Sequence, residues 1–298
     1  MEPSDLELSI KELASNLLPY FLIIPAITLI MFVMVYPVIW SIYISFYDIK
    51  LYSIFNWKFI GIDNYIELLR DPIHILSWLH TPVFVGGSVA GQFLLGMFMA
   101  AALNAIAIRG KEIFRAIFLL PYALSGVIIA YSWRFMYDPY MGLANYFLRL
   151  LGLKGVAWLS KDLALYSCTI ANIWRGTATS FIIQTAGFAS IERTLYESAE
   201  IDGAGVIQRF IHITLPMLKP FILVNLILIT MATFNTFDMV YVLTGGGPLY
   251  ASMVPSIYMY KSAFEFGLLG YGASLSVILF AVNLAFTLIY LRSIRGGV

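Results

Sequence analysis

The stretch ESAEIDGAGVIQRFIHITLP, residues 197–216, is polar and rich in helix breakers, while the sequence on either side of it is strongly apolar. Thr194 and Glu197 have the spacing of a capping box, in which two side chains satisfy the free N–H groups at a helix start. The pattern therefore predicts a short helix over about 195–202. Its small and apolar residues recur at helical spacing on one face.

The second half of this stretch predicts a break and a second helix. Glycines at 203 and 205 end the first helix, because glycine adopts positive φ values without strain. A second short helix is predicted over about 206–213, and Pro216 and Pro220 predict the exit into the next apolar segment. Such a region is either an amphipathic loop resting on lipid headgroups or a rigid knob that fits a cleft in a partner protein.

The whole chain is too apolar for a soluble domain. Of its 298 residues, 60% are hydrophobic and 12% are charged, and its mean hydropathy is +0.85. Soluble domains carry roughly 25% charged residues, so the lipid bilayer is the expected solvent. The net charge of +1 argues against a nucleic-acid partner, and the single cysteine, Cys168, excludes an intramolecular disulfide. The three histidines lack the spacing of metal ligands, so we predict no metal site.

Six stretches are long and apolar enough to cross a bilayer core as helices, which takes about 20 residues each. We therefore predict an all-α integral membrane protein in which residues 19–292 form one domain of six transmembrane helices. Residues 1–18 are predicted to be a cytoplasmic N-terminal segment, residues 293–298 a cytoplasmic tail, and residues 190–219 the loop between spans 4 and 5. The predicted spans are Pro19–Phe46, Val83–Ile108, Ile113–Tyr137, Leu163–Ala189, Pro220–Leu243 and Leu268–Leu291.

Basic residues in short loops set the predicted orientation. Arg109, Lys111 and Arg115 form the densest basic cluster, and the C-terminal tail is basic as well. Because positively charged loops stay in the cytoplasm, the N-terminus and the loop at 190–219 are predicted to be cytoplasmic. The external segments are then 48–81, 138–162 and 244–267.

Two further features each allow two interpretations. Segments 59–72 and 140–153 predict short outer helices, which lie on the membrane surface or form docking surfaces for an external protein. Gly87, Gly91 and Gly96 in span 2 mark a close helix–helix contact, or reflect the ordinary tolerance of membrane helices for glycine.

One pattern inside the opening stretch is specific. Glu197-Ser-Ala199 is followed after three residues by Gly203, and after nine more by Ile213-Thr-Leu-Pro216. This pattern resembles the signature loop of bacterial and archaeal ABC import permeases, with Ser198 in the place of the usual alanine. Nearly the whole chain, residues 19–292, is similar to the sugar-permease branch of that family, of the maltose and glycerol-phosphate type. The segments that carry this wider similarity are FIGIDNYIELL (59–69), FRAIFLLPY (114–122), YESAEIDGAGVIQRFIHITLPMLKP (196–220), FDMVYVLTGGGP (237–248) and YGASLSVILF (271–280).

The resemblance implies that residues 190–219 form a coupling loop, with a coupling helix that docks into a cleft of a cytoplasmic ATPase subunit. It also implies a complex in the cell membrane with a second, homologous permease, two ATPase subunits and an external solute-binding protein. In the family, the positions of Glu197 and Gly203 are needed for docking and for the turn. The coupling residues that the resemblance implies are Glu197, Ser198, Ala199, Asp202, Gly203, Ile213, Leu215 and Pro216.

The chain contains no nucleotide-binding loop of the form Gly-x-x-x-x-Gly-Lys-Ser/Thr. Its glycine-rich run at 244–248 lacks lysine and is predicted to be external, as a turn near the binding protein or as the end of a span. We therefore expect a non-catalytic subunit without a bound cofactor. ATP and Mg²⁺ are then used by the partner ATPase, which drives rigid-body alternating access.

Polar side chains inside spans 4 and 5 are candidates for the solute path, because such groups are costly in lipid. Arg175 and Asp238 are expected to pair with each other or with the partner permease. The rings of Trp174 and Tyr241 suit stacking on a sugar, and the amides suit its hydroxyls; alternatively, these groups only form bonds between helices. The candidates are Asn172, Trp174, Arg175, Gln184, Asn225, Asn235, Asp238 and Tyr241.

The sequence thus predicts the permease subunit of an ATP-driven importer for a sugar or a related polyol or oligosaccharide. A non-sugar solute such as glycerol phosphate is the alternative within the same family. A membrane-embedded enzyme is disfavoured because paired acidic motifs and histidine clusters are missing from the sequence. A secondary transporter is disfavoured because no inverted repeat is visible and carboxylates within the spans are few.

Overall fold

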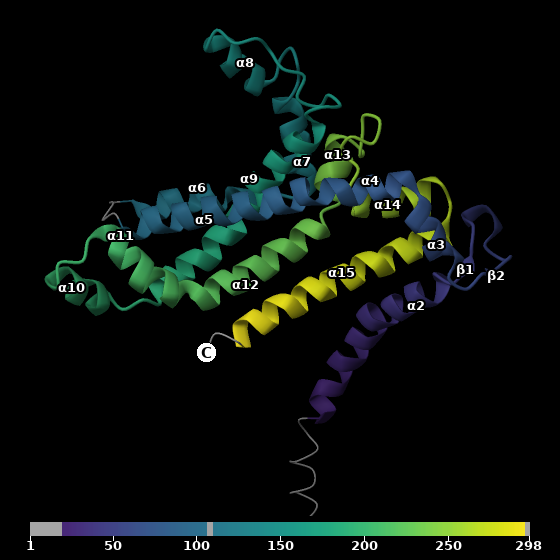
Figure 1. Ribbon diagram of the computed structural model, residues 1–298, viewed down its shortest axis with the longest axis horizontal. Coiled ribbons are helices and arrows are strands. Elements are labelled where there is room, and N and C mark those ends of the chain that lie inside the picture. Colours follow the sequence, from purple (N-terminus) through teal and green to yellow (C-terminus); the bar gives the residue numbers. More distant parts are fainter. Residues whose placement is uncertain (1–19, 106–109, 296–298) are drawn as a thin grey trace, which may run out of the picture.

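The computed structural model describes residues 20–105 and 110–295, and nearly all of them are helical (Figure 1). The predicted segment 1–18, Arg109 and residues 296–298 of the predicted tail lie outside the described residues. Two short antiparallel strands, β1 (Tyr47–Asp48) and β2 (Lys58–Phe59), pair with Tyr47 opposite Phe59.

The helices follow one another with short connections. The first helix, Tyr20–Ile44, contains the π-turn η1 (Met31–Val35) and α2 (Tyr36–Ile44). It is followed by η2 (Leu51–Ser53), α3 (Asp63–Arg70), α4 (Pro72–Thr81), η3 (Pro82–Gly86), α5 (Gly87–Ala105), α6 (Lys111–Ala123), α7 (Gly126–Met136), α8 (Leu143–Leu150), α9 (Ala164–Ala189), α10 (Arg193–Ile201), α11 (Val206–Arg209), η4 (Phe210–Thr214), α12 (Leu215–Phe234), α13 (Asp238–Leu243), α14 (Pro255–Tyr260), η5 (Lys261–Glu265) and α15 (Leu269–Arg295).

Four helices among the described residues are long and apolar enough to cross a membrane, and the bent pair α6–α7 makes a fifth if it is counted as one span. Helix α9 has 26 residues but is not among the four. It packs against α5, α6 and α12, so its polar residues face protein rather than lipid. The count of six spans therefore stays a prediction. The four are Tyr20–Ile44, Pro72–Asn104, Val206–Phe234 and Leu269–Arg292.

Two predicted spans are wrong as continuous helices. Span 3 is broken at Leu124 and Ser125, whose backbones are extended, and α7 leaves α6 at an angle of 100°. Span 5 ends at Phe234, and after residues 235–237 the chain resumes as α13. Hydropathy did not reveal these breaks, because two or three residues of irregular backbone leave a segment of more than 20 residues almost as apolar as before.

The second membrane helix begins at Pro72 rather than at the predicted Val83. The Asp71 carboxylate accepts hydrogen bonds from the N–H groups of Ile73 (2.8 Å) and His74 (3.3 Å), and thereby caps α4. Helices α4, η3 and α5 then run on as one helix, so the predicted external loop 48–81 is shorter than expected. The predicted short outer helices are present as α3 and α8.

Two details of the loop at 190–219 also differ from the prediction. The Thr194 capping box is absent: α10 begins at Arg193, and the Thr194 hydroxyl donates to the side chain of Glu192 at 3.4 Å. The second short helix does not end before Pro216, since α11, η4 and α12 form one continuous helix. The π-turn η4, which directly precedes α12, carries the helix past the proline in the first turn of α12.

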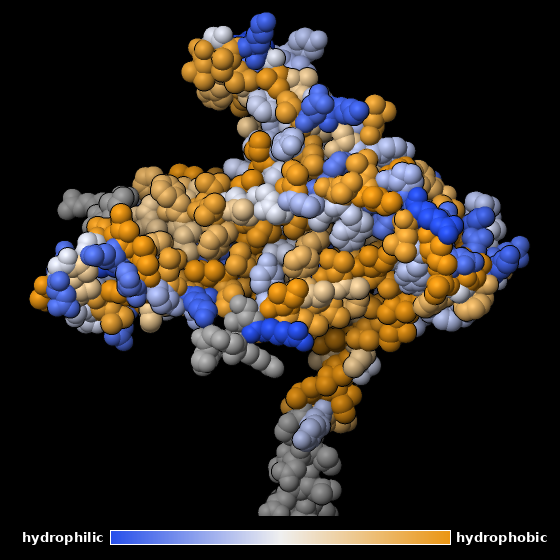
Figure 2. All heavy atoms as spheres, viewed as in Figure 1, coloured by the Kyte–Doolittle hydropathy of each residue, from blue (hydrophilic) through white to orange (hydrophobic). Residues whose placement is uncertain are grey.

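Helix α9 lies at the centre of the bundle, and close contact with α5 holds it there. A Cβ at Gly96 would lie 2.6 Å from Cβ of Ser180 and 2.9 Å from the backbone nitrogen of Phe181. The small residues of span 2 therefore serve close packing, which is the first of the two interpretations above. Figure 2 shows polar surface at the two ends of the long axis, over α10–α11 and over β1, β2 and α3, and on the part around α8 that projects at the top; the surface between the two ends is mostly apolar, with some weakly polar residues near its middle.

Candidate functional site

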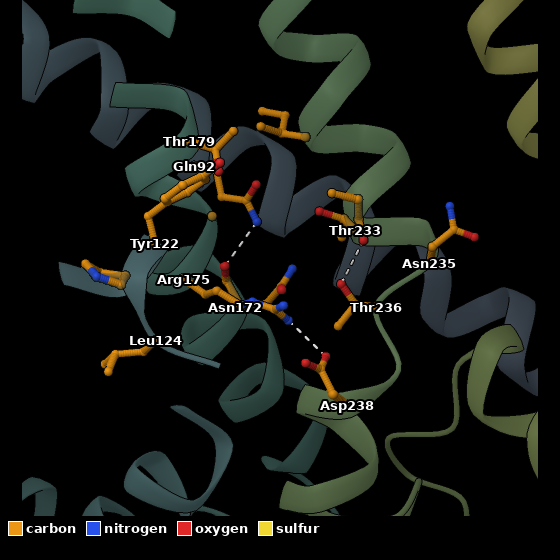
Figure 3. A pocket seen from close by; sticks show the side chains of 14 residues that line it. Gln92, Tyr122, Leu124, Asn172, Arg175, Thr179, Thr233, Asn235, Thr236 and Asp238 are labelled. Carbon is orange, nitrogen blue, oxygen red and sulfur yellow. Dashed lines mark hydrogen bonds and ion pairs between the residues drawn. The ribbon is translucent and has the colours of Figure 1, made fainter. Parts of the chain in front are cut away.

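A cavity of about 290 Å³ opens where α5, α6, α9 and α12 meet (Figure 3). Both broken helices reach it, because Leu124 lies in the α6–α7 break and Asn235 and Thr236 lie in the α12–α13 break. Interrupted helices at the centre of a transporter bundle are typical of solute sites. The lining residues are Gln92, Pro121, Tyr122, Leu124, Asn172, Arg175, Gly176, Thr179, Ile229, Ala232, Thr233, Asn235, Thr236 and Asp238.

An ion pair lies at the α13 end of this central cavity. Arg175 of α9 donates from Nη1 to Oδ1 of Asp238 at 2.9 Å, and the two side chains are 34% and 31% exposed. The Met239 N–H donates to the same carboxylate oxygen at 2.9 Å. The structure thus forms the pair within this chain, which is the first of the two alternatives that the sequence left open.

The amides in the cavity are uncharged hydrogen-bonding groups. Gln92 of α5 donates from Nε2 to the backbone carbonyl of Asn172 at 3.1 Å (Figure 3). Asn172 is 3% exposed, and its Nδ2 has no hydrogen-bond partner among the described residues. A buried donor without a partner is costly, so this amide is suited to a ligand hydroxyl or a water molecule.

Four of the eight predicted path residues line the cavity, namely Asn172, Arg175, Asn235 and Asp238. In Figure 3 the Asn235 amide points away from the ion pair, and its Nδ2 donates to the carbonyl of Met231 at 2.8 Å.

The other four predicted path residues lie elsewhere. Trp174 packs against Trp133 with ring centroids 6.1 Å apart, and Tyr241 stacks on Phe237 at 4.9 Å. Asn225 donates to the Ser180 hydroxyl at 2.8 Å. Gln184 is fully buried, and both polar atoms of its side chain lack partners among the described residues.

The sequence prediction missed several polar lining residues outside its candidate set. The general rule that polar side chains in apolar spans are functional would have selected Gln92 in span 2. The hydroxyl groups gave no such signal, because threonine occurs throughout membrane helices as a partner for backbone carbonyls. The missed residues are Gln92, Tyr122, Thr179, Thr233 and Thr236.

The loop at 190–219 forms a braced turn. Arg209 and Glu200 form an ion pair at 2.9 Å, and the hydroxyls of Tyr196 and Thr214 are 2.9 Å apart, so α10 is tied to the helix that follows. Between the two helices, Gly203 has φ +81°. No atom lies within 4 Å of the position that a Cβ at residue 203 would take.

The surface of this turn is unusually apolar for a solvent-facing segment. Ile201 is 87% exposed, and Val206 and Ile207 are each 74% exposed. Glu197 and Ser198 are exposed on α10 as well. Apolar side chains gathered on a polar surface mark an interaction site.

A notch of about 420 Å³ separates α10 from the start of the next helix. The predicted coupling residues Ala199, Asp202, Gly203 and Ile213 line it, and Leu215 and Pro216 follow at the start of α12. The notch is also lined by Ala204, Gln208, Arg209 and His212.

At the opposite end of the molecule, Asp71 holds three helices together. Besides capping α4, its Oδ2 accepts hydrogen bonds from the hydroxyls of Tyr258 in α14 and Tyr271 in α15. Burial raises the pKa of the Asp71 carboxyl, but the hydrogen bonds from the two tyrosines and from the helix N–H groups outweigh burial, so the net pKa lies below its ordinary value.

Comparison with known proteins places these features in context. Residues 92–295 match the family described as "Binding-protein-dependent transport system inner membrane component". The chain is 36% identical over 287 residues to the sulfoquinovosyl glycerol transport system permease protein SmoG of Agrobacterium fabrum, covering 95% of this chain and 92% of the relative. It is 36% identical over 277 residues to the trehalose/maltose transport system permease protein MalF of Thermococcus litoralis, covering 92% of each.

A solved structure has the same fold. It is that of a bacterial ABC transporter involved in the import of the acidic polysaccharide alginate, with a TM-score of 0.83 and 24% sequence identity. The match covers 96% of this chain and 97% of the other.

Proposed function

Because this chain belongs to the family of binding-protein-dependent transport system inner membrane components, we propose that it lines the path of a sugar through an ATP-driven importer. The predicted resemblance to ABC import permeases is confirmed by this family assignment. The chain is an inner-membrane permease subunit that works with a second permease, ATPase subunits and an external binding protein.

The solute that we propose is a sugar or a sugar derivative. Two permeases named for sulfoquinovosyl glycerol and for trehalose/maltose are each 36% identical to this chain over more than nine-tenths of it, which supports this class. The central cavity supports it as well, because its amides and hydroxyls suit the hydroxyl groups of a sugar.

We propose that the chain crosses the membrane six times. Helix α9 is one of these spans, although it is not among the four helices that are long and apolar enough to be identified from their composition. Its 26 residues are long enough to cross the bilayer core, and most of its polar side chains face its neighbours α5, α6 and α12. The α6–α7 pair then counts as one bent span. The loop at 190–219 and the β1–β2 region emerge on opposite sides, as their positions at opposite ends in Figure 1 support.

The loop at 190–219 is proposed to be the coupling loop that docks into the ATPase. The observation that carries this proposal is the family spacing from Glu197 to Pro216 on an exposed, braced turn with an apolar surface. A protruding turn with apolar anchors and a notch beside them is a shape that fits a complementary cleft.

A single helix connects this turn to the cavity. It runs without a break from Val206 to Phe234, directly before Asn235 in the cavity wall. Its 29 residues span about 40 Å at 1.5 Å per residue. When the ATPase subunits close on ATP, the helix transmits their movement to the cavity as a rigid body, while hydrolysis takes place in the partner subunit.

Reconstitution of the complete importer in proteoliposomes tests this function. Glu197→Lys should leave the protein inserted but abolish ATP-driven uptake, because it reverses a charge on the docking surface. Association of the ATPase with each complex is measured beside uptake. Glu67→Lys, the same change at an exposed position of α3 at the opposite end of the molecule, is the matched control and should leave this association unchanged. Normal uptake in the Glu197→Lys complex would contradict the assignment of the coupling loop.

A further inference from the structure

We propose that the central cavity selects uncharged sugars over acidic ones, because the Asp238 carboxylate neutralises the positive charge of Arg175 and leaves the cavity wall without a free charge. The inference rests on the solute path proposed above and adds the charge of the solute to it. It follows from the charges of the cavity wall, from the way the pair is held, and from the groups left free to bind a ligand.

The wall of the cavity carries no net charge. Arg175 and Asp238 are the only formally charged side chains among the described residues that line it. They lie 2.9 Å apart and are both about two-thirds buried. The guanidinium charge is therefore compensated by the carboxylate, and an acidic solute finds no free cation.

The ion pair is fixed in place. Asp238 accepts hydrogen bonds from both Arg175 and the Met239 N–H. On its other side the carboxylate lies against Gly126 at the start of α7, where there is no room for a Cβ. A solute that drew Arg175 away would leave this confined carboxylate without its cation, which is strongly unfavourable.

The groups that remain available are neutral. The Asn172 Nδ2 is a buried donor without a partner among the described residues, and Thr179 and Thr233 add hydroxyls to the same wall. A sugar hydroxyl both donates and accepts, so it pairs with neutral amides and hydroxyls. A carboxylate only accepts, and it loses its hydration without gaining an opposite charge in this cavity.

The test compares matched sugars on the assembled complex. The two permeases and their ATPases are placed in nanodiscs without the binding protein, so that its selectivity does not enter. Binding of trehalose, maltose and cellobiose is measured by ligand-observed NMR against the same three disaccharides with one hydroxymethyl group oxidised to a carboxylate. The variants are Asp238→Asn, which frees the Arg175 charge, and a double Arg175→Gln, Asp238→Asn variant, which removes both charges.

At least one neutral disaccharide should bind wild type about tenfold or more tightly than its carboxylate, and the double variant should keep this preference. Asp238→Asn should raise the affinity for that carboxylate by about tenfold, the effect of one charge-assisted hydrogen bond. If Asp238→Asn fails to assemble, wild type and the double variant still test the proposal. The cavity wall has no net charge in either, so both must prefer the neutral sugar to the same degree.

Equal binding of neutral and acidic sugars to wild type overturns the proposal and leaves the importer function intact. An Asp238→Asn complex that assembles but keeps the wild-type ratio overturns it as well. If the importer takes up one of these disaccharides with the binding protein present, but that same sugar does not bind the complex, the cavity is not the solute site; the selectivity proposal and the proposed path then fail, but the permease role stands.

Discussion

The left-handed turn at Gly203 makes a sharp test of the coupling loop. Its φ of +81° is a conformation that costs an L-residue roughly 1–2 kcal/mol. Because no atom lies within 4 Å of an added Cβ, Gly203→Ala introduces backbone strain and no clash within this chain. In an exposed turn the chain relieves this strain by adopting another conformation. The fraction of molecules whose turn fits the ATPase therefore falls by about 5–30-fold.

Gly205→Ala is the matched control, two residues away. Gly205 has φ −69° and also lies on the surface, so the same added methyl group brings no left-handed strain, and alanine in place of glycine at this N-cap costs about 0.5–1 kcal/mol. The assay is the affinity of the nanodisc-embedded permease pair for the fluorescently labelled ATPase. Gly203→Ala should weaken binding by up to about 30-fold and Gly205→Ala by no more than about two- to fivefold. Equal losses in both variants would refute the argument, because they would show that added bulk, and not the turn, controls docking.

Three further predictions concern packing, charge and the cavity. Gly96→Ala should lower the stability of the folded protein by about 1–3 kcal/mol, because its Cβ collides with α9. The control Gly86→Ala meets no atom within 4 Å and should leave the stability unchanged; thermal unfolding in nanodiscs measures both variants. Asp71→Asn should lower the free energy of unfolding by about 1.5–3 kcal/mol at pH 7, because the hydrogen bonds stabilise the ionised carboxylate. This difference from wild type should shrink as the pH falls through the lowered pKa of Asp71, below 3.8, and unfolding measured as a function of pH checks the sign. Asn172→Leu should weaken sugar binding to the complex by about tenfold, the loss of one hydrogen bond, while Trp174→Ala should leave it unchanged, as NMR titration would show.

The position of Trp174 outside the cavity could have been predicted from the sequence. Along an α-helix each residue turns by about 100°, so Trp174 points roughly opposite to Asn172, while Gly176 and Thr179 return to the same face. Helical phase within span 4 therefore separates the cavity-lining residues from their neighbours without a structure. The prediction considered polarity alone and combined two faces of one helix.

The broken helices could not be found in this way. In span 3, Pro121 predicts a kink, but the break itself lies at Leu124 and Ser125, and a proline inside a membrane helix does not predict a turn of 100°. In span 5, Asn235 ends α12 without a proline or glycine at the break. Long-range contacts decide such positions, and the Arg175–Asp238 pair, which joins residues 63 apart in sequence, is one of them. The coupling loop was found because its information is local, in the spacing of a few residues around one turn.

The central claim is that the turn around Glu197–Gly203 contacts the ATPase, and site-directed cross-linking measures this contact directly. The only native cysteine, Cys168, is buried, so an engineered cysteine is the sole accessible thiol in this chain. In the assembled importer, Ser198→Cys should form a cross-link to the ATPase subunit through a short thiol-to-amine reagent, and Glu67→Cys on α3 should not. The account is contradicted if Ser198→Cys gives no cross-link to the ATPase in a complex that still imports its solute, or if Glu67→Cys cross-links equally well.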